Sequence, residues 1–375
     1  NATRIEWAEV CPKSEGDEIY VLGNPPYLGA RLQSKEQKAD MAEVFQGIKN
    51  FNNLDYIACW FYKGASYIKN AHAKAAFVST NSISQGEQVG ILWTHILDEN
   101  IEIDFAYKSF KWQNNAKANA AVIVVIIGLR NNSSKPKYLY IDNIKHEVKN
   151  INAYLVNAEN IIVQKRSKPI SKLKPMSFGN MPNDGGGLIL STEEKNSLID
   201  EFPHAKKFIR KLLGSYEFIN GAERFCLWIK NEDLDEALQI PFIQKRIEKT
   251  KEHRLNSKDA GTKKLASRSH QFRDLNEYEN VAMIVPANTS ERREYVPIGF
   301  LHNQEVISNS AQAVYDAEHW LMGIISSKIH MAWMRAVGGR LKTDYRYSKD
   351  VVYNTFPFPN ISQKQKDEIT ELVWG

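Results

Sequence analysis

The fold is decided by Ile19-Tyr20-Val21-Leu22-Gly23-Asn24-Pro25-Pro26-Tyr27. Its first five residues form a short apolar run, which is typical of a buried strand. The two prolines fix φ and lack N–H donors, so the strand must end near Gly23 and the carbonyl groups that follow are held in place. In open α/β sheets ligands bind at the carboxyl ends of the strands, so Asn24 stands where a binding site is expected.

The residues around this stretch alternate between strand and helix patterns. Apolar residues at helical spacing predict a helix from Leu54 to Ile68, and the pattern predicts another over 85–97. The runs 75–80, 101–107 and 120–127 read as strands, and the last of them is apolar throughout. Continuous apolar strands separated by helices predict an α/β fold whose sheet is covered on both faces.

The four residues Asn24, Pro25, Pro26 and Tyr27 predict methyl transfer to the exocyclic amino group of a conjugated base. Such a nitrogen is a poor nucleophile because its lone pair is delocalised into the ring. The side-chain oxygen of Asn24 and the carbonyl of Pro25 can each accept one of its N–H bonds, which points the lone pair at the methyl donor. Tyr27 offers a ring for stacking, and a base in a duplex must be flipped out to reach it. The alternative is a simple proline-rich turn, which the strand before and the helix after make less favoured.

Composition sets broad limits on the chain. Its 375 residues are enough for two domains or more, and a net charge of +5 permits a polyanionic partner. The three cysteines are widely spaced, so they indicate neither a disulfide framework nor a metal site, and they favour a reducing cytoplasm. The nine histidines are scattered, and we expect no metal centre. The longest apolar run, 120–127, is too short to cross a bilayer, so no membrane partner is expected.

The character of the sequence changes after a linker-like stretch at 131–136. The βα alternation ends there, and 179–187 is a turn-rich loop that closes on the triple glycine 185–187. The triple glycine is a weak candidate for a cofactor loop, and we interpret it as a turn. Ser191 and Glu194 have the spacing of a capping box that opens a helix.

The strongest charge feature is the basic segment, residues 243–273, with ten Lys or Arg and three acids. Its alternative is a solvated helix face with a mobile loop, but a base-modifying motif elsewhere favours contact with DNA phosphates. The residues predicted to make that contact are Lys245, Arg246, Lys249, Lys251, Arg254, Lys263, Lys264 and Arg268.

Two expected features are missing from the sequence. A sheet that binds S-adenosylmethionine usually has a glycine-rich loop after its first strand and an acidic residue after its second, and too few residues precede Asn24 for both. There is also no convincing Asp…Glu-x-Lys nuclease pattern. We therefore expect the carboxyl-terminal part of a larger protein, with S-adenosylmethionine as cofactor and an incomplete site for it here.

Many short motifs, in one order, resemble the MmeI-like class of bifunctional restriction–modification enzymes and their DNA-methyltransferase relatives. These motifs run through almost the whole chain and include 23–29, 54–56, 79–83, 85–89, 110–112, 224–228, 290–293, 339–342 and 353–357. The resemblance implies a nuclease region first, then an amino-methyltransferase domain, then a target-recognition region, with the upstream regions as partners in the same polypeptide. It also implies N6 methylation of adenine in double-stranded DNA.

The resemblance assigns roles to further residues. It suggests that Phe110 or Trp112 packs against the extruded base, with ordinary core packing as the alternative, and that Arg292 and Arg293 contact phosphates. The fold it implies is the C-terminal half of a Rossmann-like methyltransferase sheet followed by an α+β target-recognition domain. We expect the methyltransferase part at 1–150, the recognition domain at 151–300, and a C-terminal segment at 301–375 that packs with the recognition domain.

The stretch 340–346 lies in the expected recognition region. If it is extended, period-two geometry puts Arg340, Lys342, Asp344 and Arg346 on one face. Lys342 and Asp344 would then read the two halves of one G·C pair, and Arg346 a neighbouring guanine. The alternative is a surface salt-bridge ladder of little energetic value.

Three other functions stay open. An N4-cytosine methyltransferase uses the same amine chemistry. Enzymes that methylate RNA or protein glutamine share Asn-Pro-Pro-Tyr, although a long basic recognition region makes them less favoured. The third is a DNA-binding recognition module that is inactive on its own.

Overall fold

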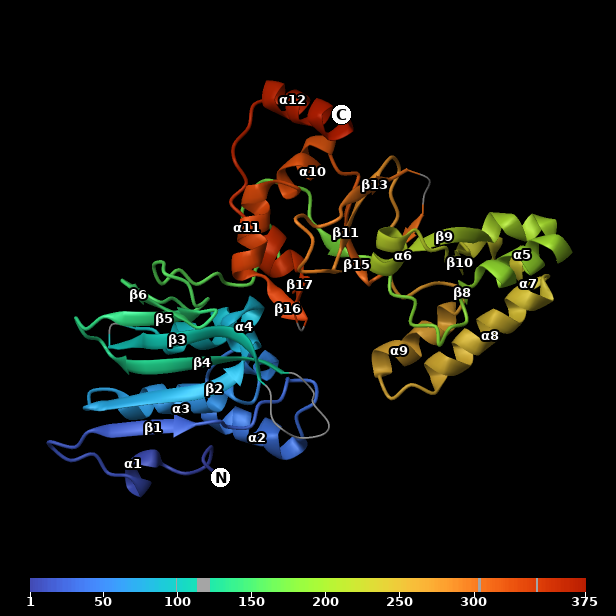
Figure 1. The fold of residues 1–375 in the computed structure, drawn as a ribbon. Helices are drawn as coiled ribbons and strands as arrows, with labels where there is room; N and C mark the ends of the chain where they lie inside the picture. The colour runs from blue at the N-terminus through green and yellow to red at the C-terminus, as the bar shows by residue number, and fades with distance from the viewer. Residues whose placement is uncertain (99, 113–121, 303–304, 342) are drawn as a thin grey trace. The chain divides into compact units, whose positions relative to one another are not determined.

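The computed structural model describes residues 1–98, 100–112, 122–302, 305–341 and 343–375, and these form two compact units (Figure 1). Unit 1 comprises Asn1–Ser167 and Trp333–Thr355, and unit 2 comprises Lys168–Ala332 and Phe356–Gly375. This division differs from the boundaries expected from the sequence. Unit 1 continues past residue 150, and it takes up a late segment of the chain that we expected to pack with the recognition domain.

Unit 1 is built around one six-stranded sheet with the order β1-β2-β4-β3-β5-β6. Its strands and helices are α1 (Trp7–Val10), β1 (Ile19–Gly23), α2 (Lys35–Val44), α3 (Ala58–Ile68), β2 (Ala73–Thr80), α4 (Gly86–Leu92), β3 (Ile101–Trp112), β4 (Val122–Asn131), β5 (Lys137–Ile141), β6 (Ile144–Val148), β16 (Gly339–Leu341) and β17 (Asp344–Arg346), with a π-helical turn at Lys349–Tyr353.

The strand directions in unit 1 decide which loops meet. β1 is parallel to β2, β2 is antiparallel to β4, and β4 is antiparallel to β3. It follows that β1, β2 and β3 all run the same way and that their carboxyl ends share one edge of the sheet. The loop after β1 therefore lies at the same edge as the residues after β2.

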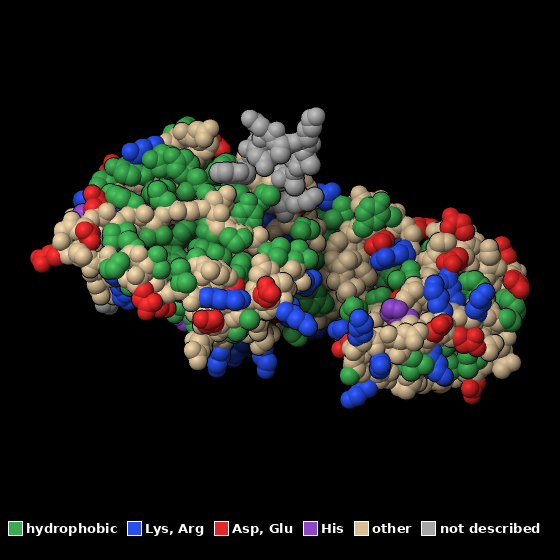
Figure 2. Space-filling view, turned by 90° about the horizontal axis from the view of Figure 1, so that it is seen from below, with side chains coloured by type: hydrophobic (Ala, Val, Ile, Leu, Met, Phe, Trp, Pro, Cys, Tyr) green, Lys and Arg blue, Asp and Glu red, His purple; other side chains and the backbone are tan. Residues whose placement is uncertain are grey.

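One face of this sheet is packed and the other is partly open. Phe77 on β2 packs edge-on against Phe61 of α3, and α3 covers this face (Figure 1). On the opposite face Tyr20 and Leu22 of β1 are 56% and 72% exposed. Hydrophobic side chains gather on unit 1, at the left of Figure 2. The expectation of a sheet covered on both faces was therefore wrong for β1 among the described residues.

Local signals explain where the helices of unit 1 begin and end. Ser34 and Gln37 form a capping box at the start of α2. The helix expected over 85–97 is shorter than predicted, because α4 gives way at Trp93 to a 3₁₀ turn, Trp93–His95. The indole of Trp93 is buried and donates to the carbonyl of Ile83 at 2.7 Å, which fixes this end of the helix in the core.

Unit 2 contains two four-stranded sheets, with the orders β14-β9-β10-β8 and β13-β11-β15-β7. Its elements are β7 (Ser177–Phe178), β8 (Ile189–Leu190), α5 (Thr192–Glu201), β9 (Ile209–Leu213), α6 (Ser215–Asn220), β10 (Phe225–Leu227), α7 (Leu234–Leu238), α8 (Pro241–Leu255), α9 (Ala260–Lys264), β11 (Ala282–Pro286), β12 (Asn288–Thr289), β13 (Gly299–Leu301), β14 (Val306–Ile307), β15 (Ala311–Tyr315), α10 (His319–Ile325) and α12 (Gln363–Trp374). α11 (Lys328–Val337) begins in unit 2 and ends in unit 1.

The turn-rich loop before β8 confirms the interpretation of the triple glycine as a turn. Gly185 has a φ of +59°, a backbone conformation that residues with a side chain rarely adopt. A Cβ on Gly187 would lie 2.1 Å from the hydroxyl oxygen of Thr250 in α8. The loop is therefore pressed against α8 inside unit 2. The capping box of Ser191 and Glu194 at the start of α5 is also present as predicted.

The late segment of unit 1 is held by hydrogen bonds to residues earlier in the chain. The amide of Arg166 donates to the carbonyl of Asp350 at 2.9 Å, and the side chain of Asn354 donates to the carbonyl of Arg166 at 2.8 Å. The backbone of Gly339 in β16 also lies close to Gly86, where an added Cβ would meet it at 3.5 Å. These contacts explain why residues 333–355 belong to unit 1.

Candidate functional site

The Asn-Pro-Pro-Tyr loop, residues 24–27, follows β1 directly, as the sequence predicted. β1 pairs with β2 as far as Gly23, which lies opposite Phe77. Asn24 is exposed beyond the strand end, whereas Tyr27 is half-buried and packs against the core of unit 1. The side-chain oxygen of Asn24 is thus accessible to a ligand, and the ring of Tyr27 is held in place by the core beneath it.

The loop is anchored at its far end through the backbone of Leu28. The amide of Leu28 donates to Oδ1 of Asp55 at 2.7 Å. The carbonyl of Leu28 accepts from the amide of Tyr56 at 3.0 Å and from the side chain of Gln33 at 3.1 Å. Both backbone groups of the residue after Tyr27 are therefore fixed to the segment that leads into α3.

Asp55 is a buried carboxylate that joins several elements. Its Oδ1 also accepts from the amide of Ile57 at 3.3 Å, and its Oδ2 lies 3.5 Å from the hydroxyl of Thr80 at the end of β2. Its own amide donates to the side chain of Gln88 in α4 at 3.1 Å. Burial raises the pKa of Asp55, and the backbone donors of Leu28 and Ile57 oppose that rise.

The predicted stacking residues lie on β3. Phe110 is half-buried and pairs in register with Val124, after an irregularity between Tyr107 and Phe110. Because β3 runs parallel to β1 and β2, Phe110 lies toward the same sheet edge as the Asn-Pro-Pro-Tyr loop. The side chain of Trp112 lies outside the described residues.

The stretch 340–346 is a hairpin rather than one extended strand. Arg340 lies opposite Tyr345, Leu341 opposite Asp344, and Gly339 opposite Arg346. Residues directly opposite in an antiparallel pair share a face, so Arg340 points to the other face from Asp344 and Arg346. The expectation that all four side chains share a face was therefore wrong, and Lys342 lies outside the described residues.

The side chain of Arg340 interacts with other residues of this hairpin. Its guanidinium lies 4.4 Å from the ring centroid of Tyr345 and donates to the carbonyl of Thr343 at 3.0 Å. Asp344 and Arg346 are both exposed. A base-reading role therefore fits Asp344 and Arg346 better than Arg340.

The basic segment folds into α8, α9 and a 3₁₀ turn, Leu265–Arg268. Its six lysines are exposed and available to a polyanion, namely Lys245, Lys249, Lys251, Lys258, Lys263 and Lys264. The exposed residues Arg292 and Arg293 lie outside this segment but in the same unit.

Arg254 does not fit the phosphate contact that the sequence predicted. Its side chain is fully buried, and its five N–H donors go to the backbone carbonyls of Asn183, Leu265, Arg268, Pro182 and Gln271 at distances between 2.7 and 3.0 Å. A guanidinium has five donors in all, so none remains for a phosphate. Burial, and after it the charge of Arg268, lowers the pKa of Arg254.

Two further arginines of the basic segment are also engaged inside the fold. Arg246 forms an ion pair with Glu194 and donates to the carbonyl of Gly186 at 3.0 Å. Arg268 donates to the carbonyls of Phe272 and Arg273, both at 2.6 Å. The lysines of this segment, rather than these arginines, are therefore its better candidates for phosphate contact.

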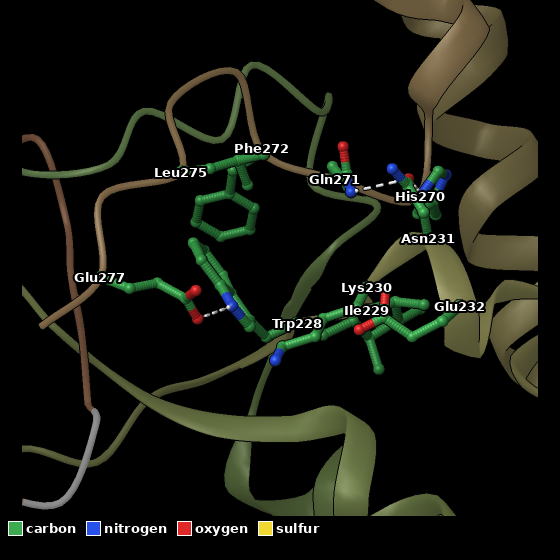
Figure 3. Close-up of a pocket in the computed structure, with 11 residues that line it drawn as sticks. Trp228, Ile229, Lys230, Asn231, Glu232, His270, Gln271, Phe272, Leu275 and Glu277 are labelled. Carbon is green, nitrogen blue, oxygen red and sulfur yellow. Dashed lines mark hydrogen bonds between the residues drawn. The ribbon is translucent and has the colours of Figure 1, made fainter. Parts of the chain in front are cut away.

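A half-open pocket of about 200 Å³ lies in unit 2 beside the end of β10 (Figure 3). The indole of Trp228 donates to Glu277 at 2.8 Å, and the same carboxylate oxygen accepts from Arg210 at 2.7 Å. Asn231 binds the side chains of His270 at 2.9 Å and Gln271 at 3.0 Å. Because these polar groups are paired with one another, the pocket is better explained as part of the folded framework than as a ligand site.

Two further kinds of feature are absent from the described residues. No group of three or more His, Cys, Asp or Glu is placed to hold a metal ion within 1–98, 100–112, 122–302, 305–341 and 343–375. Over the same ranges, no helix has the length and apolar character needed to cross a bilayer.

The residues that sequence reasoning missed are those that hold the Asn-Pro-Pro-Tyr loop, namely Gln33, Asp55, Thr80 and Gln88. One signal was available in the sequence. Asp55 is an acidic residue within the apolar stretch 54–61, where a buried carboxylate needs hydrogen-bond donors. Its partners, however, come from segments far apart in the chain.

Comparisons with known proteins cover both units. A family model described as the DNA-methyltransferase domain of MmeI matches residues 1–141, and one described as its target recognition domain matches residues 157–360. DNA methyltransferase A of Bacillus subtilis (strain 168) is 50% identical over 374 residues, which is 100% of this chain and 42% of that protein. The type IIL restriction–modification enzyme MmeI, solved in complex with DNA, is 40% identical with a TM-score of 0.92, over 100% of this chain and 51% of that one.

Proposed function

The chain belongs to the MmeI family, whose members join a DNA-methyltransferase domain to a target recognition domain, and from this we propose that it is part of a site-specific DNA methyltransferase. The proposed reaction is N6 methylation of adenine in double-stranded DNA, within a restriction–modification system of the cytoplasm. Phe110 and Trp112 are proposed to pack against the flipped base, and Asp344 and Arg346 to read base edges.

The observation that carries this proposal is the exposed Asn24 at the carboxyl end of β1, in a loop fixed at both ends. Asn24 Oδ1 and the Pro25 carbonyl accept the two N–H bonds of the target amine, and Tyr27 stacks on the base. These acceptors favour the pyramidal nitrogen, so its lone pair is directed toward the methyl donor. The exposed lysines of the basic segment hold the duplex through its phosphates.

We propose that the site for S-adenosylmethionine is incomplete in this chain. The triple glycine at 185–187 is packed against α8 and belongs to unit 2, so it is not a loop of the unit 1 sheet. Within the described part of the chain β1 is an edge strand of that sheet, and its Tyr20 and Leu22 are exposed. We therefore assign the cofactor contacts to an upstream region of the same polypeptide that completes the sheet at β1, preceded by a nuclease region.

A second function, methylation of cytosine at N4, uses the same exocyclic amine and the same acceptors. Analysis of the modified nucleosides in methylated DNA separates the two. A third, a recognition module that is inactive alone, applies to the isolated chain: we expect it neither to methylate DNA nor to bind S-adenosylmethionine tightly. Micromolar binding of the cofactor to this chain in calorimetry would contradict that expectation.

The test of the proposal uses the full-length protein, labelled S-adenosylmethionine and a duplex that contains its recognition sequence. Asn24→Ala removes one acceptor for the reacting amine, and a hydrogen bond to a group that gains positive charge is worth roughly 1.5–3 kcal/mol. The rate should therefore fall about tenfold to hundredfold or more. Asn52→Ala, at an exposed asparagine elsewhere in unit 1, is the matched control. Wild-type rates from Asn24→Ala would reject the assigned role.

A further inference from the structure

We propose that Asp55 is a positioning residue for the reaction, acting through the backbone of Leu28 to set the geometry of the Asn-Pro-Pro-Tyr loop. This inference rests on the proposed function. Asp55 touches neither the target base nor the donor in this proposal. Its effect on the reaction passes through a single residue, the one that follows Tyr27.

The loop has two attachment points, and Asp55 supplies the second. At the first, Gly23 is held in the sheet opposite Phe77. At the second, the amide of Leu28 donates to Oδ1 of Asp55 at 2.7 Å, which is shorter than the bonds that the Leu28 carbonyl accepts from Tyr56 and Gln33. The two prolines between these points have fixed φ angles, so a shift at Leu28 is passed on to Asn24 and Tyr27 rather than absorbed.

Asp55 is itself firmly placed. It is 5% exposed, its amide donates to Gln88 at 3.1 Å, and its Oδ1 also accepts from the amide of Ile57 at 3.3 Å. The hydroxyl of Thr80, which ends β2, lies 3.5 Å from Oδ2. One side chain thus connects the loop after β1, the end of β2 and the start of α3.

The reaction requires such precision at the loop. The lone pair of the target nitrogen must point at the methyl group, and its direction is set by Asn24 Oδ1 and the Pro25 carbonyl. A displacement of about 1 Å in a positioning group can lower a rate roughly 100-fold. A loop that is free at Leu28 would still bind DNA through the rest of the protein, but it would present its acceptors in many orientations.

The test compares Asp55→Ala with Asp55→Asn in the full-length protein. Alanine removes the acceptor for the Leu28 amide, whereas asparagine keeps an oxygen at the same place. We expect Asp55→Ala to lower kcat about tenfold to hundredfold with little change in the Kd for DNA, and Asp55→Asn to restore most of kcat. Equal losses in both variants, or an unchanged kcat in Asp55→Ala, would overturn the proposal.

A second buried carboxylate serves as the control. Asp104 is 8% exposed and pairs with Lys74 at 2.9 Å and Arg130 at 2.7 Å, at the amino end of β3 and so at the opposite edge of the sheet. Asp104→Ala should destabilise the fold while kcat per folded molecule stays at the wild-type value. If Asp55→Ala does not fold, Gln33→Leu removes another bond to Leu28 and should lower kcat in the same direction, and a wild-type kcat would then overturn the proposal.

Hydrogen exchange separates a failure of this inference from a failure of the proposed function. Asp55→Ala should lose protection in the peptide that contains Leu28, and Asp55→Asn should keep it, whether or not the protein methylates DNA. A wild-type protein that leaves every duplex unmethylated would reject the function alone. Equal protection at Leu28 in all three proteins would reject the anchoring role of Asp55.

Discussion

Asp55 in unit 1 and Arg254 in unit 2 are buried ions that organise loops in opposite ways. Asp55 accepts hydrogen bonds from the backbone amides of Leu28 and Ile57, so it fixes a loop through the loop's N–H groups. Arg254 donates to five backbone carbonyls, so it fixes the surrounding loops through their C=O groups. In both cases the partners of the charge are largely main-chain groups, which are not visible as a sequence pattern.

The difference between them lies in how completely each ion is satisfied. The guanidinium uses all of its donors, so replacing it leaves several buried carbonyls without partners. The carboxylate of Asp55 takes part in three bonds, of which those from Ile57 at 3.3 Å and Thr80 at 3.5 Å are longer than any made by Arg254, and an amide can replace it. We therefore expect Arg254 to matter mainly for stability and Asp55 mainly for the placement of a loop.

Arg254→Leu should have the largest effect on stability. Removing one member of a buried charged network costs about 3–5 kcal/mol, and here the carbonyls of two separate loops lose their donor. Urea unfolding of the chain measures the change. The same substitution at the exposed Arg292 should alter stability by less than about 0.5 kcal/mol, so equal losses at the two positions would remove the distinction drawn for Arg254.

The next effect concerns base reading in the hairpin of unit 1. The double variant Lys342→Glu with Asp344→Arg, in the full-length protein, inverts the donor and acceptor that the sequence pattern predicts for one G·C pair. One position of the recognition sequence should change from G·C to C·G, and each mismatched pair is worth about 1–3 kcal/mol of binding. Sequencing of the methylated sites identifies the change. An unaltered recognition sequence with full activity would leave the hairpin without a reading role.

Lys263 and Lys264 of the basic segment should contact phosphates and not bases. Lys263→Ala with Lys264→Ala should weaken binding to all duplexes alike and reduce the slope of log K against log salt by roughly 2. Fluorescence anisotropy at several salt concentrations measures this slope. Lys38→Ala with Lys364→Ala removes the same charge from two other exposed positions and controls for net charge. A changed sequence preference with an unchanged slope would argue for base contact instead.

The smallest effect is a pH dependence at Asp55. Because burial raises the pKa of Asp55 in the folded chain, the folded state holds this proton more tightly than the unfolded state does. The contribution of Asp55 to stability is therefore greatest at acid pH and is lost as the pH rises through the folded-state pKa. Asp55→Asn has no such proton, so its unfolding free energy relative to wild type should increase as the pH rises from 3.8, the ordinary value for an aspartate, through the folded-state pKa of Asp55. A constant difference across this range would contradict the raised pKa.

Much of unit 1 could be predicted from its sequence because its strands and helices show hydrophobic patterns within short stretches of the chain. The strand Ile19–Gly23 was predicted with its observed bounds, and the α/β class and the MmeI resemblance are confirmed. The open face of β1 could not be predicted, because apolar residues such as Tyr20 and Leu22 look the same whether or not another segment covers them. The hairpin at 339–346 was missed because period-two reasoning detects extended backbone but not a turn within it.

The candidate site shows the same division. Asn24 to Tyr27 were found because a strand, two prolines and an aromatic residue are adjacent in sequence. Arg254 was misassigned because a basic residue in a basic segment gives no sign that backbone carbonyls surround it. Asp55 lies in one of the motifs that carry the resemblance, but it was given no role because its partners, Leu28, Thr80 and Gln88, are brought to it by the fold alone.

The free side of β1 also affects how the chain behaves in concentrated solution. A strand at a sheet edge presents backbone N–H and C=O groups to any extended segment that meets it, and proteins often protect such edges with charges or prolines. Here the edge strand carries Tyr20 and Leu22 on its open face. We therefore expect two copies of this chain to pair edge to edge, and self-association that grows with concentration should weaken when Leu22 is replaced by lysine.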